Sequence, residues 1–382
     1  MTTIMLSAGE ASGDVHGGTL CRALVEMAPG IRLVGMGGPR MTAAGMEVVV
    51  DPTRQAVVGA SEAVGRLPAL YRAYRDLVAR LRAERPRALV LIDFPEFNMR
   101  LGRQAHRAGV PVVYFIPPQI WAWRRGRIRQ IARRVSRVLA VFPFERALYE
   151  EAGVPVEFVG HPVLDTLPLG LEREEARRLL QVAPGQPTVG LLPGSRREEV
   201  ERLLPAMLDA ARRLAASDGR RRFVLGLAPT LERRQIDTVL ERAVAAGAPP
   251  VQAFEGKTHE VMAAADVLLV ASGTATLEAA LLGAPMVVCY RVSRLTELIA
   301  RLRAHVSWIS LPNLVAGRAV VPELLQGDVS GTRLAVEALR LLEDAAAATA
   351  QRAAFKDLRA RLGEPGVGYR AARAVLGVAR AA

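Results

Sequence analysis

Short apolar segments rich in β-branched residues alternate with longer segments of helical periodicity along almost the whole chain, and this alternation limits the folds open to it. It is typical of a parallel sheet covered by helices, because parallel strands need a long crossover connection between them. A first series of expected strands, with a helix over residues 67–84 among their connections, covers residues 3–7, 32–35, 88–93, 111–116, 137–141 and 156–159. A second series covers residues 188–192, 223–227, 251–254, 267–271 and 285–290.

The two series predict an α/β protein with two doubly wound, Rossmann-like parallel sheets that face a cleft. A chain of 382 residues suits two domains of this kind. Between the series the chain becomes rich in proline and glycine, with one charged helix near residues 171–180. We therefore expect an N-terminal domain over residues 1–165, a linker over 166–186, a C-terminal domain over 187–345 and C-terminal helices over 346–382. The part after Gly368 either returns to the first domain or reaches another subunit.

The composition of the chain says more about the cellular compartment than about the function. The formal net charge is +13, but only two of the 51 basic residues are lysine, so the charge looks like a genomic bias and is weak support for a nucleic-acid partner. Cys21 and Cys289 lie in apolar segments without partner spacing, as expected of buried thiols in a reducing compartment. We find neither a signal-peptide pattern nor an apolar run of about 18 residues, and therefore expect neither export nor a membrane span.

Two motifs in the second half, residues 191–196 and 271–278, have the order strand, turn of small residues, helix start. Such a turn directs backbone N–H groups and the positive end of a helix dipole at one point, which favours an anion. A pair of them beside one sheet predicts a diphosphate site, and a carboxylate one helical turn further on could accept hydrogen bonds from both ribose hydroxyls. Helix capping alone would also explain either turn, although the arginine of the first favours a phosphate ligand. The candidates are Gly194, Ser195, Arg196, Ser272, Gly273, Thr274 and Glu278.

Two loops in the first half also follow expected strands. Residues 7–18 are rich in glycine and small residues that allow close approach of a ligand, and they carry polar side chains, with helix capping as the alternative. Asp93 ends an apolar strand, and partly apolar surroundings can raise the pKa of a carboxyl group toward a value useful for a general base; a plain N-cap role is the alternative. The candidate ligand residues of these loops are Gly9, Glu10, Ser12, Asp14, Glu96 and Asn98.

A basic segment over residues 121–135 pairs two tryptophans with many arginines. Ile128, Ile131 and Val135 recur at helical spacing between the arginines, which predicts an amphipathic basic helix. Such a segment suits a membrane surface, and a solvated helix face with core tryptophans explains it equally well. The candidates for membrane or acyl contact are Trp121, Trp123, Arg124 and Arg125.

Other familiar sites find no support. The five histidines show no ligand spacing and no Asp-x-Asp occurs, so we expect neither a catalytic metal nor a cofactor. Gly35, Gly37 and Gly38 lack the third glycine of a dinucleotide fingerprint, because Arg40 stands in its place. There is no Gly-x-Ser-x-Gly elbow either, which counts against a serine hydrolase.

Taken in order, the motifs resemble those of the lipid-A-disaccharide synthases, glycosyltransferases with the two-domain GT-B fold. The likeness runs from Ser7 to about Leu325, through residues 9–14, 93–98, 121–123, 142–145, 160–162, 192–196, 272–278 and 311–314. The resemblance implies transfer of 2,3-diacylglucosamine from its UDP donor to 2,3-diacylglucosamine 1-phosphate, giving a β(1→6) disaccharide and UDP without a metal. It implies Asp93 as the base, and nucleotide contacts from Glu278 and Asn313.

The resemblance also implies partners and a place in the cell. The N-terminal domain would take the acceptor and the C-terminal domain the UDP-sugar. A lipid substrate gives the basic segment a purpose at an anionic membrane surface, so we expect a cytoplasmic protein peripheral to the inner face of the inner membrane. We expect no nucleic-acid partner, and we consider a homodimer through the C-terminal helices.

Some positions depart from the family's pattern, namely residues 117–120, Phe94 and Glu96. They concern acyl-chain preference and acceptor details rather than the reaction class. Two alternatives remain open from the sequence. A UDP-sugar 2-epimerase or another GT-B transferase with a soluble acceptor would share the fold. A non-catalytic basic protein would not need two anion turns and a placed carboxylate.

Overall fold

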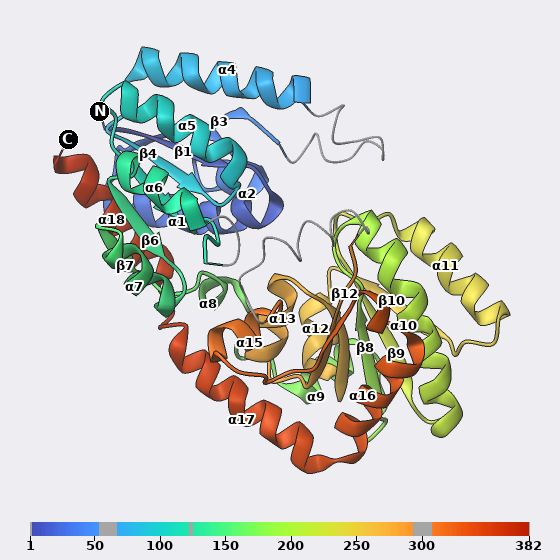
Figure 1. The fold of residues 1–382 in the computed structure, drawn as a ribbon. Coiled ribbons are helices and arrows are strands. Elements are labelled where there is room, and N and C mark those ends of the chain that lie inside the picture. Colours follow the sequence, from blue (N-terminus) through green and yellow to red (C-terminus); the bar gives the residue numbers. More distant parts are fainter. Residues whose placement is uncertain (1, 53–66, 122–124, 293–307, 382) are drawn as a thin grey trace. The chain divides into compact units, whose positions relative to one another are not determined.

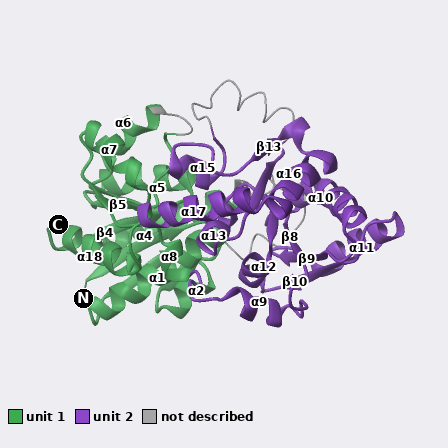
Figure 2. Cartoon of the chain, turned by 90° about the horizontal axis from the view of Figure 1, so that it is seen from below, with its two compact units in different colours: residues 1–166, 362–382 green, residues 167–361 purple. Residues whose placement is uncertain are grey.

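The computed structural model describes residues 2–52, 67–121, 125–292 and 308–381, and these form two compact units. One unit comprises Met1–Thr166 with Leu362–Ala382, and the other comprises Leu167–Arg361 (Figure 2). Each is built on a parallel sheet with helices around it (Figure 1). The predicted α/β class with two doubly wound sheets is therefore confirmed.

The sheet of the first unit has the strand order β3-β2-β1-β4-β5-β6-β7, with every pairing parallel. Its strands are β1 (Thr3–Ala8), β2 (Arg32–Met36), β3 (Glu47–Val50), β4 (Ala88–Ile92), β5 (Val112–Phe115), β6 (Arg137–Ala140) and β7 (Val156–Phe158). Its helices are α1 (Ala11–Met27), α2 (Pro39–Ala43), α4 (Leu67–Glu84), α5 (Pro95–Arg107), η2 (Arg125–Arg127), α6 (Ile128–Arg134), α7 (Pro143–Glu151), α8 (Val163–Thr166) and α18 (Val367–Ala381). β4 is buried along its whole length, as expected of a central parallel strand covered on both faces.

The sheet of the second unit has the order β10-β9-β8-β11-β12-β13, again parallel throughout. Its strands are β8 (Thr188–Leu192), β9 (Arg222–Leu227), β10 (Val251–Glu255), β11 (Val267–Ala271), β12 (Met286–Tyr290) and β13 (Glu323–Leu325). Its helices are α9 (Arg173–Leu179), α10 (Arg197–Ser217), α11 (Arg233–Ala245), α12 (Thr258–Ala264), α13 (Thr274–Leu281), α15 (Leu311–Ala316), η3 (Gln326–Asp328), α16 (Gly331–Glu343) and α17 (Ala345–Arg361).

In both sheets all strands are parallel, but the order in which they are added switches from one side of the first strand to the other. In the first unit the chain builds outward from β1 to β3 and then returns to place β4 on the other side of β1. In the second unit β11 takes the corresponding place beside β8. Doubly wound sheets bind ligands beyond the carboxyl ends of the strands at such a switch point. The four loops that the sequence singled out follow these four strands.

Of residues 166–186, expected as a linker, Thr166 lies in the first unit and all the others lie in the second. Ala176 and Leu180 are buried in its core, so α9 is packed rather than connecting. Arg173 pairs with Asp266, and that carboxylate accepts a hydrogen bond of 2.8 Å from the amide of Thr188.

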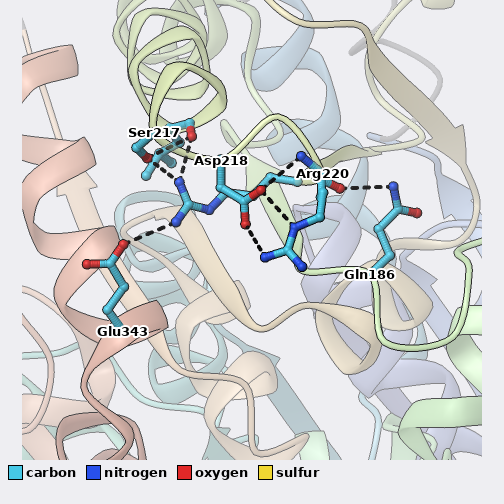
Figure 3. A network of polar contacts seen from close by, with 7 residues as sticks. Gln186, Ser217, Asp218, Arg220 and Glu343 are labelled. Atoms are coloured by element: carbon cyan, nitrogen blue, oxygen red, sulfur yellow. Dashed lines mark hydrogen bonds and ion pairs between the residues drawn. The ribbon is translucent and has the colours of Figure 1, made fainter.

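A polar network before β9 also attaches residue Gln186, from the expected linker, to the second unit (Figure 3). Gln186 donates to the carbonyl of Arg220 at 3.0 Å, and the guanidinium of Arg220 holds Asp218 at the end of α10. Arg221 reaches Glu343 of α16 at 3.3 Å. The network fastens the segment before β8 to two helices of the second unit.

The C-terminal helix α18 returns to the first unit, where it packs along α1 (Figure 1). Asp165 caps it, because its carboxylate accepts from the amides of Gly366, Val367 and Gly368 at 2.6, 3.1 and 2.8 Å. One face of α18 is buried, including Ala371 and Val375. Of the two destinations considered for this helix, the structure shows the first.

Cys21 and Cys289 are buried and unlinked, as predicted. Burial raises the pKa of each thiol to about 12. Among the described residues, every helix is too short or too polar to traverse a lipid bilayer.

Candidate functional site

The turn after β4 holds two residues in the left-handed region. Asp93 and Phe94 both have φ +47°, which is uncommon for residues other than glycine and persists only where the surroundings fix it. The carbonyl of Asp93 accepts from Asn98 Nδ2 at 2.7 Å and from the Tyr114 hydroxyl at 3.1 Å. Burial raises the pKa of Tyr114 well above its ordinary value, so its hydroxyl remains a donor. The half-buried Asp93 is thus presented at the switch point by a clamped, strained turn.

Asn98 is the clamp between β1 and β4. It is fully buried, and its amide also donates to the carbonyls of Ser7 and Ile92, both at 3.1 Å. Its Oδ1 accepts from the Ser7 hydroxyl at 2.7 Å. We expected Asn98 to contact a sugar, but its polar atoms bind the chain itself. Its place in the site is therefore to hold Asp93.

The β1–α1 loop and the β4–α5 turn touch at Gly9. A Cβ atom at Gly9 would lie 2.1 Å from the ring of Phe94, so glycine is required for this approach. Phe94 in turn stacks on Phe97 with ring centroids 5.5 Å apart. Glu10, at the start of α1, and Ser12 are exposed beside this contact.

Asp14 lies differently from the expectation of a ligand contact. The carboxylate of Asp14 is buried and accepts from the amides of Gly38, Arg40 and Met41 at 2.7, 3.0 and 3.1 Å. This is the capping alternative, applied to α2. Glu96 is exposed and pairs with Arg127.

The amides of the turn after β8 face Glu199, the third residue of α10, in the arrangement of a helix capping box. Gly194 has φ +117°, and a Cβ atom there would lie 2.5 Å from Glu199 Oε2. The same oxygen accepts from the amides of Ser195 and Arg196 at 3.3 and 3.4 Å. Arg196 Nη1 reaches Glu199 Oε1 at 3.0 Å, although its side chain is 69% exposed. The amides expected to face a phosphate therefore face Glu199.

The turn after β11 leads directly into α13 at Thr274. Gly273 lies at the N-cap position, and its carbonyl accepts from the amide and hydroxyl of Thr276 at 3.1 and 2.8 Å. Glu278 is half-buried, and its Oε2 lies 3.7 Å from Nε2 of His259 on α12. His259 was missed by the sequence reasoning, which noted only that the histidines have no ligand spacing.

Asn313, expected to contact the nucleotide, is fully buried and engaged by the chain. Its Oδ1 accepts from the amides of Val320 and Val321 at 2.7 and 2.9 Å, and its Nδ2 donates to Val321 O and Glu323 Oε1. Glu323 also accepts from the amide and hydroxyl of Ser310 at 2.9 and 2.6 Å. Glu323 therefore fixes the start of α15, and Asn313 fastens α15 to the segment that follows it.

Tyr290, at the end of β12, was also missed by the sequence reasoning. It is half-buried, and burial, with the neighbouring Glu199 carboxylate, raises its pKa. Its hydroxyl is thus another polar group near the β8–α10 turn. Its only sequence signal is a polar atom at the end of an apolar strand.

Trp121 is anchored inside the first unit. Its indole N–H donates to Glu145 at 3.2 Å, and its ring packs edge-on against Phe142 and Phe144, with centroids 6.5 and 5.1 Å away. Glu145 is buried, and burial raises its pKa to about 7. Trp123 and Arg124 lie outside the described residues, and Arg125 is described only as the start of η2.

Helices α5 and α6 bring four arginines together on the first unit, which we name the α5/α6 arginine cluster: Arg103, Arg107, Arg133 and Arg134. Burial and the other three guanidinium groups lower the pKa of Arg134. The other three side chains are exposed. A cluster of like charges favours an anionic partner.

Within the described ranges, no group of three or more His, Cys, Asp or Glu side chains is arranged to hold a metal ion.

A family model described as lipid-A-disaccharide synthetase matches residues 4–373. The lipid-A-disaccharide synthase of Anaeromyxobacter dehalogenans strain 2CP-1 is 44% identical over 377 residues, 99% of this chain and 97% of that protein. The chain belongs to the lipid-A-disaccharide synthase family. The Syntrophus aciditrophicus relative of the same name is 43% identical over 97% of this chain and 96% of its own.

Members of this family are glycosyltransferases that condense UDP-diacylglucosamine with diacylglucosamine 1-phosphate in lipid A biosynthesis. Solved structures show the GT-B fold. The UDP-GlcNAc 2-epimerase of Neisseria meningitidis, bound to UDP-GlcNAc, has a TM-score of 0.66 at 12% identity and covers 99% of this chain and 100% of its own. The kitacinnamycin glycotransferase has a TM-score of 0.63 at 17% identity, with 99% and 98% covered. The epimerase alternative therefore shares the fold, whereas the family model and the curated relatives place the chain with the synthases.

Proposed function

We propose that in this chain the first unit binds the acceptor and supplies the base, while the second unit binds the UDP moiety of the donor. Asp93 takes the proton of the acceptor's 6-hydroxyl as that oxygen bonds to the anomeric carbon of the donor. The bond from this carbon to the diphosphate oxygen breaks, and its electron pair leaves with UDP. Configuration inverts, and the product is the β(1→6)-linked disaccharide 1-phosphate.

The observation that carries the role of Asp93 is the strained turn of Asp93 and Phe94 at the switch point. Two adjacent left-handed residues other than glycine cost roughly 1–3 kcal/mol each, and such strain gathers at functional sites. Capping alone would not require Asn98 and Tyr114 to fix the carbonyl of Asp93. The exposed Glu10 and Ser12, with Gly9, stand nearby on the β1–α1 loop as acceptor contacts.

Glu199 marks the diphosphate position. Its carboxylate accepts the amide hydrogen bonds that a phosphate oxygen would take at the start of α10. Arrival of UDP displaces Glu199, and the exposed guanidinium of Arg196 moves from this carboxylate to the diphosphate, where it stabilises the leaving charge. Ser272, Gly273 and Thr274 supply the second turn, and Glu278 accepts from the ribose hydroxyls.

We further propose that the protein works at the cytoplasmic face of the inner membrane, because its substrates are lipids. The α5/α6 arginine cluster supports this proposal as an anionic-lipid contact, joined by the neighbouring segment with Trp121. A homodimer through the C-terminal helices would have to use their outer faces, because the apolar faces of α17 and α18 are buried within the chain.

Product analysis with UDP-diacylglucosamine and diacylglucosamine 1-phosphate tests these roles. Asp93→Asn should lower kcat by about 10² to 10⁴ with little change in UDP affinity, because it removes only the proton acceptor. Arg196→Ala should weaken UDP binding as well as turnover. Glu150→Gln is the matched carboxylate control, since it removes an exposed charge pair on α7 of the same unit and should change kcat less than about threefold. Near-normal turnover by Asp93→Asn would place the base elsewhere.

The turnover of the wild-type protein should also survive treatment with EDTA.

A further inference from the structure

His259 and Glu278 form a pair that joins two helices of the second unit. His259 is the second residue of α12, and Glu278 lies four residues after the start of α13, about 6 Å along the helix. Nε2 of His259 is 3.7 Å from Oε2 of Glu278, with 36% and 25% of the two side chains exposed. One oxygen of Glu278 thus faces the imidazole, which leaves Oε1 for another donor.

We propose that His259 is a positioning residue for nucleotide binding, which holds Glu278 for the ribose and offsets its negative charge. The inference rests on the proposed ribose contact of Glu278. A carboxylate this close to a diphosphate site repels the incoming dianion, and a cation on its far oxygen removes that cost. The imidazole also limits the rotamers of Glu278, so less freedom is lost when the ribose binds.

The charges around His259 favour its protonated form. The contact with Glu278 raises the pKa of His259, with burial opposing, and Glu260 on the same helix acts in the same direction as Glu278. Other charges near α12 are already bound: Lys257 donates to the carbonyl of Leu179 at the end of α9. On α9 itself, Arg173 pairs with Asp266 and Arg177 donates to Gln186 O. The protonation of His259 therefore depends mainly on its contact with Glu278.

This arrangement makes ribose recognition depend on pH. At lower pH the imidazolium holds Glu278, and the contact weakens as the pH rises through the raised pKa of His259. UDP affinity alone cannot report this, because the phosphate titrates in the same range. The ratio of affinities for UDP and 2′,3′-dideoxy-UDP can, since both ligands carry the same diphosphate.

Calorimetric titration of the full chain with both nucleotides at pH 6 and pH 8.5 tests the proposal. The preference of the wild-type protein for UDP over 2′,3′-dideoxy-UDP should decrease as the pH rises. His259→Ala should weaken UDP binding about tenfold and dideoxy-UDP binding little, because the variant removes the ion pair that positions Glu278 for the ribose hydroxyls, which dideoxy-UDP lacks. His259→Gln, which keeps an N–H donor, should recover part of the preference and remove its pH dependence. His106→Ala, an exposed histidine of α5, is the control.

Each result decides a separate point. Equal losses for both nucleotides in His259→Ala, or a wild-type preference that does not change with pH, would overturn the role of His259. Glu278→Gln should abolish the preference for UDP. If it does not, the proposed ribose contact of Glu278 is at fault rather than its partner. Thermal unfolding of each variant identifies any loss caused by misfolding, and His259→Gln then carries the test.

Discussion

At the scale of single residues, Glu145 shows how a buried carboxyl group can hold a site together. It accepts from the amides of Val141 and Phe142, both at 3.1 Å, and from the indole of Trp121. These bonds favour its charged form, but burial is the larger effect and raises its pKa to about 7. The group therefore titrates in the physiological range beside an aromatic cluster.

His161, whose pKa burial lowers to about 3, makes stability rise with pH, but we expect the component contributed by Glu145 to fall between pH 4.5 and about 7. In this window the folded state keeps a proton that the unfolded state releases, so raising the pH favours unfolding, by up to roughly 3 kcal/mol. Glu145→Gln should lack this component, whereas Glu150→Gln, exposed on the same helix, should keep it. Urea unfolding at pH 5, 6, 7 and 8 measures the difference. Parallel curves for wild type and Glu145→Gln would contradict it.

The polar residues also show what the sequence could not decide. Asp93 and Arg196 were predicted just after strands and Glu278 one turn into a helix, and the structure has each of them there, in segments that follow β4, β8 and β11. Asn98 and Asp14 were predicted as ligand contacts from their loops after strands, and Asn313 from the resemblance, yet all three bind backbone groups of the chain. An amide or carboxylate after a strand serves a ligand or an orphaned backbone group equally well, and only three-dimensional contacts separate the two.

At the scale of elements, Gly9 couples the β1–α1 loop to the β4–α5 turn. We expect Gly9→Ala to lower kcat at least tenfold, because its Cβ would collide with Phe94 and displace the turn that presents Asp93. Phe94→Ala should make room for the new methyl group. The double variant should then lose less than the sum of the two single variants, which kinetics and thermal unfolding can measure as a double-mutant cycle.

An additive double variant would show that the two loops act independently. Gly219→Ala is the matched glycine control, since a Cβ atom there has nothing within 4 Å and φ is not in the left-handed region. It should leave kcat unchanged. This control separates the collision with Phe94 from the general effect of a glycine substitution on the unfolded chain.

Most strands could be predicted because each is an apolar run between helical segments, and buried parallel strands have that composition. β3 and β13 were not predicted. Both are short edge strands, and the half-buried residues of β3 lack a continuous apolar signal. The expected linker was assigned from its prolines and glycines, but Ala176 and Leu180 bury α9 in the second unit. His259 and Glu278 are far apart in sequence and meet only because α12 packs on α13.

At the scale of the whole molecule, the two units repeat one architecture. Each places its polar loops at the switch point of a parallel sheet. The chain crosses between the units twice, near Thr166 and Leu362, and Asp165 fastens the returning helix by its first amides. The C-terminal helix α18 is therefore part of the same unit as Asp93.

The whole molecule must also reach substrates that partition into lipid. We expect it to bind anionic vesicles more tightly than neutral ones, and to release them as salt rises, because exposed charges are screened beyond about 8 Å at physiological ionic strength. Replacing Arg103 and Arg107 by Gln should weaken binding roughly 30-fold at low salt, since each arginine near the surface contributes about 1 kcal/mol.

Co-sedimentation at low and high salt measures this effect, with Arg212→Gln and Arg213→Gln as the control pair. These two arginines are already paired with Asp209 on α10, so their loss should change vesicle binding little. Equal losses in both pairs would mean that net charge, rather than the α5/α6 arginine cluster, governs membrane binding. Binding that survives both salt and the cluster substitutions would instead assign it to apolar contacts, such as those of the segment that follows Trp121.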